Sequence, residues 1–320
     1  MPLAKIIDYR LLYKASALYY EKGLMQSEIG NRLSISRTKV SRLLKQAEEV
    51  GIVKHVITPL GGVNTDIEDK LESRFNLTEA VVVEVSDPDS EKAILREIGS
   101  AAALFFHRVL SDPCIIGMAW GKAMREMVDN FLIHDLSHSE LVQLNGGLGS
   151  PESDTHITYI LRKAVDQLGC KLSILNLPGI VDTLAAKDIM MSDSHVKEVF
   201  DMFPKIDRAF VGIGDIEYLT MSNINKLVSK KELNNIMTAG AVGEICLRFF
   251  NIEGKLIPST IDDRVIGISL DELKTIHHVT AVAGGHQKVK SIIGALNGGL
   301  INALVTDRNC AISILENTET

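Results

Sequence analysis

Seven short apolar runs recur along residues 61–320, and stretches with helical periodicity separate one run from the next. An apolar run of this length is typical of a strand buried on both faces, and helices between successive strands favour parallel pairing. The sequence therefore predicts an α/β fold with a Rossmann-like, mostly parallel sheet covered by helices on both faces. The predicted strands are residues 79–85, 114–120, 140–146, 171–177, 208–214, 277–284 and 301–307.

The clearest break in the chain lies just before this pattern, where Pro59, Gly61 and Gly62 interrupt it. A short helix follows the break. We therefore expect two domains, a small one over residues 1–60 and a larger one over residues 61–320.

Charge is distributed unequally between these two predicted domains. The net charge of the whole chain is −7, but residues 1–60 carry ten Lys or Arg against five acidic residues, a net of +5, which leaves −12 for the remainder. A basic segment attached to an acidic body can attract phosphates while the body stays away from them. This pattern predicts a nucleic-acid-binding head on a body with another task.

Composition argues against several other classes of protein. The first residues lack the apolar core and cleavage site of a signal peptide, and no run approaches the roughly 18 to 20 apolar residues of a membrane helix. We expect a cytoplasmic protein without membrane contact. The four cysteines are far apart in sequence and lie among apolar residues, which predicts buried reduced thiols and no metal site: Cys114, Cys170, Cys246 and Cys310.

The basic head has the pattern of a helix-turn-helix, three helices of which the third presents a charged face. Apolar spacing predicts helices over residues 8–22 and 26–33, and Ser36 can cap a third helix that runs to about Val50. The apolar side of this third helix must pack on the other two, so its opposite side is free to enter a major groove. The predicted DNA-binding residues are Gln26, Ser36, Arg37, Thr38, Lys39, Ser41, Arg42 and Lys45.

Two alternatives stay open for the head. A basic helical face can be a solvated surface with no nucleic-acid partner, although the two short helices, the hydroxyl cap and the confined charge occur together here. Residues 52–58 alternate apolar and polar side chains, which predicts a strand that could form a short wing.

Glycine-rich turns follow several of the predicted strands in the body. In parallel sheets the ligand crevice lies at the carboxyl ends of the strands, where glycines let backbone amides approach an anion. Each turn taken alone could simply reverse the chain. Together they predict an anion-binding crevice built from residues 120–121, 145–150, 212–215, 240–244 and 284–288.

The run YYEKGLMQSEIGNRLSISRTKVSRLLKQAEEVGIV, residues 19–53, resembles the DNA-binding head of the SorC/DeoR-type sugar-responsive regulators. The resemblance implies that Ser36 to Leu44 form the recognition helix. Two positions depart from the family pattern, because many relatives have Thr in place of Met25 and Gly in place of Ser34. Loss of the Thr removes a cap from the second helix, a change of about 1 kcal/mol that leaves the assignment intact.

Nearly the whole body resembles the sugar-binding domain of the same family, which is related in fold to ribose-phosphate isomerases and glucosamine-phosphate deaminases. The resemblance implies that the NGGLGS loop cradles a phosphate, that Glu244, where many relatives have Asp, meets sugar hydroxyls, and that Lys288 meets the anionic group. The predicted effector-binding residues are Trp120, Gly121, Gly146, Gly147, Gly149, Ser150, Gly212, Gly214, Gly243, Glu244 and Lys288.

These observations predict a regulator of a carbohydrate-utilisation operon that binds operator DNA and a phosphorylated sugar or sugar alcohol, without a cofactor. We expect a dimer or tetramer, and the resemblance favours a tetramer. The rival interpretation is a sugar-phosphate isomerase or deaminase, but residues 217–220 lack the His that the deaminases use after such a turn. A dinucleotide enzyme fits less well, because residues 147–152 lack the third glycine of GxGxxG.

Overall fold

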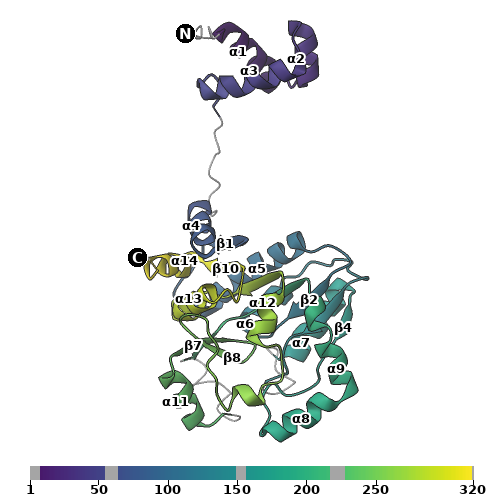
Figure 1. Ribbon diagram of the computed structural model, residues 1–320, viewed down its shortest axis with the longest axis vertical. Helices are drawn as coiled ribbons and strands as arrows, with labels where there is room; N and C mark the ends of the chain where they lie inside the picture. The colour runs from purple at the N-terminus through teal and green to yellow at the C-terminus, as the bar shows by residue number, and fades with distance from the viewer. Residues whose placement is uncertain (1–7, 55–63, 149–155, 217–227, 319–320) are drawn as a thin grey trace, which may run out of the picture. The chain divides into compact units, whose positions relative to one another are not determined.

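The computed structural model describes residues 8–54, 64–148, 156–216 and 228–318 (Figure 1). Its contacts divide the chain into two compact units, residues 1–61 and 62–320, which are described separately below. Within the described residues, none of the helices combines the length and apolar character that crossing a membrane requires.

The first unit is the predicted three-helix scaffold. Helix α1 (Tyr9–Ser16) continues into one wider turn, η1 (Ala17–Glu21), and is followed by α2 (Gln26–Leu33) and α3 (Arg37–Glu49). The bounds of α2 agree with the prediction. Apolar side chains from all three helices form one core, and its fully buried members are Leu12, Ala15, Ile29, Val40 and Ala47.

Local chemistry fixes the ends of α3. The Ser36 hydroxyl accepts a hydrogen bond from the Lys39 amide at 3.2 Å, which confirms the predicted cap. Gly51 has a φ of +77°, a conformation that glycine adopts without strain, and it stops the helix. The next described residues, 52–54, form no strand, because the Ile52 amide bonds back to a helix carbonyl. The rest of the predicted wing lies outside the described residues.

The second unit contains the predicted parallel sheet, and all seven predicted strands form it. Every neighbouring pair is parallel, and the order across the sheet is β1-β10-β9-β5-β2-β3-β4. The strands are β1 (Glu79–Val83), β2 (Ile115–Met118), β3 (Glu140–Gln143), β4 (Lys171–Ser173), β5 (Arg208–Val211), β9 (His278–Val282) and β10 (Ala303–Asp307).

Helices cover both faces of this sheet, and side chains alternate between two cores. In β5, Phe210 joins the core on one face, whereas Ala209 and Val211 join the core on the other. The Phe210 face is covered by α5 (Glu91–Val109), α6 (Lys122–Asp129) and α7 (Ile157–Leu168). The other core includes side chains from α4 (Thr65–Phe75), α9 (Ser194–Phe200), α12 (Leu270–Thr275), α13 (Val289–Asn297) and α14 (Arg308–Glu316) (Figure 1).

A smaller antiparallel sheet was not predicted. It consists of β6 (Gly214–Asp215), β7 (Ala241–Ile245) and β8 (Arg248–Asn251), and α11 (Lys230–Thr238) contributes to the core beside it. The prediction of a turn over residues 240–244 is therefore wrong beyond Gly240. The real turn lies between β7 and β8 at Cys246 and Leu247, whose φ angles of +52° and +67° are uncommon for residues other than glycine.

Helix α4 is tied to the exposed edge of the parallel sheet by its side chains. The carboxylates of Glu72 and Glu68 accept hydrogen bonds from the backbone amides of Ala80 and Val82, each at 2.8 Å. The Asn64 side chain donates to the Val82 carbonyl at 3.0 Å. These side chains pair with the outer edge of β1 where a further strand would otherwise pair.

All four cysteines are buried and free, which confirms the prediction of buried thiols.

Candidate functional sites

A cavity of about 260 Å³ opens at the carboxyl ends of the parallel strands. From β2 the chain builds outward through β3 to β4, whereas β5 and β9 lie on the other side of β2. This reversal makes the junction of β2 and β5 the switch point of the sheet, where the connections diverge and leave a crevice. The segments after β2, β3, β5 and β9 line the cavity, together with β7 and its turn.

The cavity brings together six of the predicted effector-binding residues from distant parts of the sequence: Trp120, Gly121, Gly212, Gly214, Glu244 and Lys288. Within the described part of the chain, thirteen further residues line the cavity: Glu91, Leu95, Ala119, Lys122, Ala123, Asn145, Leu148, Ile213, Cys246, Val282, Ala283, Gly284 and Gln287.

Glu244 and Lys288 place opposite charges deep in this cavity. The Glu244 carboxylate accepts a hydrogen bond from the Leu247 amide at 2.7 Å, and the Lys288 Nζ donates to the Ile213 carbonyl at 2.8 Å. Burial raises the pKa of Glu244 and lowers the pKa of Lys288, and the charge of each residue opposes the shift of the other. Gly214 makes room for this carboxylate, because a Cβ there would overlap Glu244.

A turn anchored by a buried carboxylate sets the position of Lys288. One oxygen of Asp307 accepts from the Gly285 amide at 2.6 Å, and the other caps α14 by accepting from the Cys310 amide at 2.9 Å. Gly285 has a φ of +94°, which favours glycine. Asp307 therefore holds the backbone from which Lys288 reaches the cavity.

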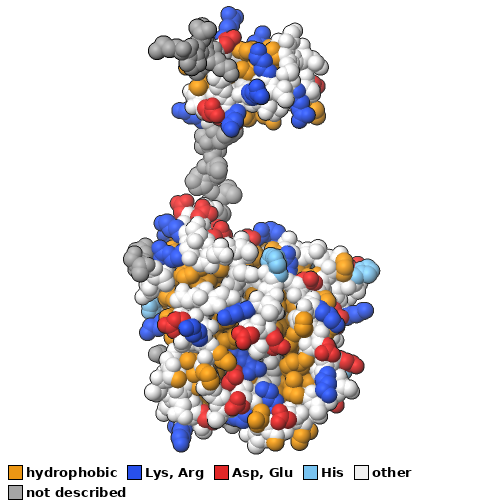
Figure 2. All heavy atoms as spheres, in the orientation of Figure 1, with side chains coloured by type: hydrophobic (Ala, Val, Ile, Leu, Met, Phe, Trp, Pro, Cys, Tyr) orange, Lys and Arg blue, Asp and Glu red, His pale blue; other side chains and the backbone are white. Residues whose placement is uncertain are grey.

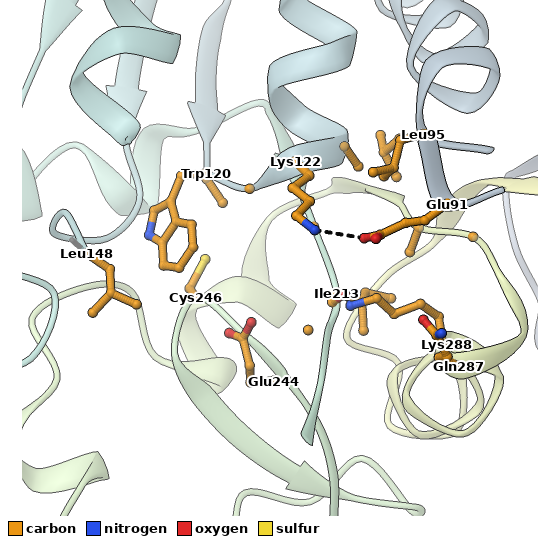
Figure 3. Close-up of a pocket in the computed structure, with 18 of the residues that line it drawn as sticks. Glu91, Leu95, Trp120, Lys122, Leu148, Ile213, Glu244, Cys246, Gln287 and Lys288 are labelled. Atoms are coloured by element: carbon orange, nitrogen blue, oxygen red, sulfur yellow. Dashed lines mark hydrogen bonds and ion pairs between the residues drawn. The ribbon is translucent and has the colours of Figure 1, made fainter. Parts of the chain in front are cut away.

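Lys122 lies nearer the surface, at the first position of α6. Its Nζ lies 2.9 Å from Glu91, the first residue of α5 (Figure 3). The N-cap of α6 is Gly121, which provides no side-chain hydrogen bond, and the first turn contains no acidic residue. Amides at such a helix start, beside a lysine, are suited to an anion.

Apolar groups form another part of the wall. In the view of Figure 3, Trp120 and Leu148 lie at one end of the cavity, and Lys122, Glu91 and Lys288 lie at the other. An indole ring can pack against the C–H groups of a sugar, whereas the charged end suits an anionic substituent. The cavity can therefore hold a small ligand that has one polar, charged end.

Three of the predicted glycines do not line the cavity. Close packing explains why each of these positions is a glycine. A Cβ on Gly146 would lie 2.6 Å from the Pro178 carbonyl oxygen, one on Gly147 would overlap the His156 ring, and one on Gly243 would overlap Ser291. The other two residues predicted in this group, Gly149 and Ser150, lie outside the described residues, as do residues 217–220.

Sequence reasoning missed both partners of the surface ion pair in the cavity. Lys122 directly follows the predicted Gly121, and a basic residue at a helix start after a strand is the signal that could have identified it. Glu91 has no such signal, because only the packing of α5 beside α6 brings it to the cavity. Asn145, Gly284 and Gln287 belong to predicted turns but were not selected.

The predicted DNA-binding residues lie together in the first unit. The seven residues on α3 and its cap are all exposed, and Gln26 is half-buried at the start of α2. The side of α3 that carries Val40, Leu43, Leu44 and Ala47 is buried, so the charged side faces solvent as expected. Figure 2 shows Lys and Arg side chains spread over the visible face of this unit.

The chain is similar to known regulators along most of its length. Residues 62–316 match the family model described as "Putative sugar-binding domain". The chain is 32% identical to the sorbitol operon regulator of Klebsiella pneumoniae over 97% of this chain and 98% of that protein. It is 30% identical to the deoxyribonucleoside regulator of Bacillus subtilis, over 96% and 97% of the two chains.

Structural comparison agrees with these matches. The crystal structure of the full-length sorbitol operon regulator SorC from Klebsiella pneumoniae superposes with a TM-score of 0.75, covering 97% of this chain and 99% of that chain at 32% identity. Both named relatives are regulators, and neither name describes an enzyme. The chain therefore belongs to the SorC/DeoR-type family of transcriptional regulators that carry a sugar-binding domain.

Proposed function

We propose that the chain is a DNA-binding regulator of a carbohydrate-utilisation operon, and that a phosphorylated sugar or sugar alcohol in the cavity controls its affinity for operator DNA. In this proposal residues 1–60 bind DNA, and residues 61–320 bind the effector and hold copies of the chain together.

The chemistry of the cavity is the observation that carries the choice of effector. Lys122 and the open first turn of α6 supply a cation and backbone donors near the surface, and Lys288 supplies a second cation in the interior. Glu244 can accept hydrogen bonds from hydroxyls. A phosphate ester of a polyol needs these groups, an anion-binding end and a hydroxyl-binding end, in a space of this size.

The exposed face of α3 supports binding to double-stranded DNA. Its arginines can bond to guanine edges in a major groove, and its lysines and hydroxyls can contact phosphates. A single unit this small contacts too little DNA for specific affinity, so we propose a dimer or tetramer that binds half-sites separated by whole helical turns. A hundredfold effect of the effector on DNA affinity requires about 2.7 kcal/mol of coupling between the two sites.

Thermal unfolding of the full-length protein tests the effector class. A panel should contain pentose phosphates, hexose phosphates and hexitol phosphates, each beside its unphosphorylated form. A ligand that binds the folded state at 100 times its Kd adds about 2.7 kcal/mol of stability, so a matching phosphate ester should raise the Tm. A Tm that responds to neutral sugars and to no phosphate ester would contradict the proposal.

Fluorescence and DNA binding complete this test. Trp120, the single tryptophan, lines the cavity and should report the same ligand. Operator DNA should bind with an affinity that falls steeply with salt and shifts when the ligand is added. Conversion of the ligand into a product, detected by chromatography, would instead favour an isomerase or deaminase.

A further inference from the structure

The carboxylate of Glu91 already occupies the place beside Lys122 that an anionic ligand needs. The two side chains lie 2.9 Å apart, and both line the cavity (Figure 3). They come from different helices, since Glu91 begins α5 and Lys122 begins α6. The first turn of α6 contains no acid of its own, so a carboxylate from α5 lies against the lysine at this helix start.

Exposure separates this pair from the charges deeper in the cavity. The side chains of Lys122 and Glu91 are 44% and 59% exposed, so either can be solvated when the contact breaks. Glu244 is buried and Lys288 is half-buried, and separation of these charges without replacement would leave a charge in a poorly solvated place. Exchange of partners is therefore easier at Lys122 than at Lys288.

Close packing of the two helices keeps this exchange local. Gly99 of α5 lies directly against α6, where an added Cβ would overlap Glu126. The starts of the two helices therefore stay in register. Rotation of the exposed Glu91 side chain into solvent breaks its contact with Lys122 without a movement of the backbone.

The balance of charge makes the exchange necessary for an anion. Among the described residues of the lining, Lys122 and Lys288 are the cations, and Glu91 and Glu244 are the acids. A phosphate placed beside Lys122 would meet the negative charge of Glu91 if that side chain stayed in place. A neutral sugar would meet no such repulsion.

We propose that Glu91 is an exchangeable counter-ion, which the phosphate of the effector displaces from Lys122, and that Glu91 thereby tunes the selection between phosphorylated and neutral ligands. This inference rests on the proposed effector class. It assigns Glu91 a role in setting affinity and leaves the hydroxyl contacts to other residues.

The experiment compares variants of the full-length protein by calorimetric titration with three probes: inorganic phosphate, sorbitol 6-phosphate and sorbitol. Glu91→Gln keeps the size of the side chain and removes its charge. Since an exposed ion pair is worth up to about 1 kcal/mol, this variant should bind the two phosphate compounds about two- to fivefold more tightly, with sorbitol unchanged. Lys122→Gln should weaken binding of both phosphate compounds.

A double variant and a matched control separate competition from a general change in charge. Glu91→Gln should add nothing in a Lys122→Gln background, because the cation for which two anions compete is gone. Glu84→Gln is the control: Glu84 is 60% exposed, pairs with Arg308 at 3.6 Å and does not line the cavity. It should leave all three titrations unchanged.

Three outcomes would overturn the inference. If the wild-type protein binds phosphate compounds but Glu91→Gln binds them no more tightly, the role of Glu91 fails and the proposed function stands. An equal gain in the Lys122→Gln background, or in Glu84→Gln, would show a long-range charge effect and not exchange at Lys122. If the wild-type protein binds no phosphate compound at all, both proposals fail.

Discussion

The exposed face of α3 and the cavity of the second unit both gather charged side chains, but they hold them in opposite states. On α3, Arg37, Lys39, Arg42 and Lys45 are exposed to solvent. In the cavity, Lys288 is half-buried and bonded to a carbonyl, and Lys122 lies against a carboxylate. The cations of α3 are exposed to water, whereas the cations of the cavity form hydrogen bonds or ion pairs within the protein.

This difference predicts two kinds of response to substitution. Exposed cations act on a ligand through screened, roughly additive attractions, so each contributes a modest share that salt weakens. Charged groups in the interior of the cavity have larger individual effects, since loss of one leaves the opposite charge less well compensated in a poorly solvated place. The variants below test this contrast, from the largest expected effect to the smallest.

Lys288→Ala should show the strongest effect on the effector. Loss of one partner from a desolvated charged site costs about 2–5 kcal/mol, so affinity for the phosphate ester should fall about 30-fold or more. DNA binding without effector should persist. Lys290→Ala, an exposed lysine two residues away, is the control and should keep wild-type affinity. Simultaneous loss of DNA binding in the folded Lys288→Ala protein would contradict the separation of the two sites.

A pair of glycine variants should define the limits of the cavity. Gly147→Ala forces a Cβ against the His156 ring, which should destabilise the fold by about 1–3 kcal/mol and leave effector affinity of the folded protein unchanged. Gly212→Ala meets only an ordinary contact, 3.6 Å from the Trp120 carbonyl oxygen, and adds its methyl group to the lining. This variant should keep the wild-type Tm and bind the effector more weakly. Denaturant unfolding measures the stability, and titration measures the affinity for the effector. If Gly147→Ala weakened effector binding and kept the stability, Gly147 would belong to the binding site.

Arg42→Ala should weaken recognition of a specific operator by about 1–3 kcal/mol, the value of a bidentate contact to guanine. Effector binding should be unchanged, as measured by titration. Arg10→Ala removes the same side chain from the exposed part of α1 and is the control. An equal loss in both variants would show that total charge, and not the face of α3, determines recognition.

Ser36→Ala should have the smallest effect, a loss of about 1 kcal/mol in the stability of α3. Hydrogen exchange of the full-length protein should show faster exchange in the first turn, where the Lys39 amide loses its side-chain acceptor and keeps only the Ser36 carbonyl. Ser41→Ala, an exposed serine farther along the same helix, should not accelerate it. Unchanged exchange in Ser36→Ala would mean that the cap contributes nothing to the helix.

The first unit could be predicted closely because its signals are local. A hydroxyl at Ser36, a glycine at Gly51 and apolar spacing determine where its helices begin and end, and each acts within a few residues. The seven strands of the larger sheet were likewise predictable, since an apolar run of that length must be buried on both faces.

The antiparallel sheet and the residues that line the cavity could not be predicted in the same way. No glycine marks the turn at Cys246 and Leu247, so sequence alone placed the turn several residues too early. Gly147 and Gly212 look alike in sequence. Only the tertiary neighbour of each distinguishes a packing position from a lining position: an added Cβ would overlap the His156 ring at Gly147, whereas at Gly212 it would make an ordinary contact with the Trp120 carbonyl.

The carboxylates of α4 have a mechanical consequence. If this helix moved away from β1, it would leave the amides of Ala80 and Val82 without acceptors, so helix and strand move as one body. Helix α4 is the first described helix of the second unit, so these hydrogen bonds tie the start of the described part of that unit to the edge of the sheet.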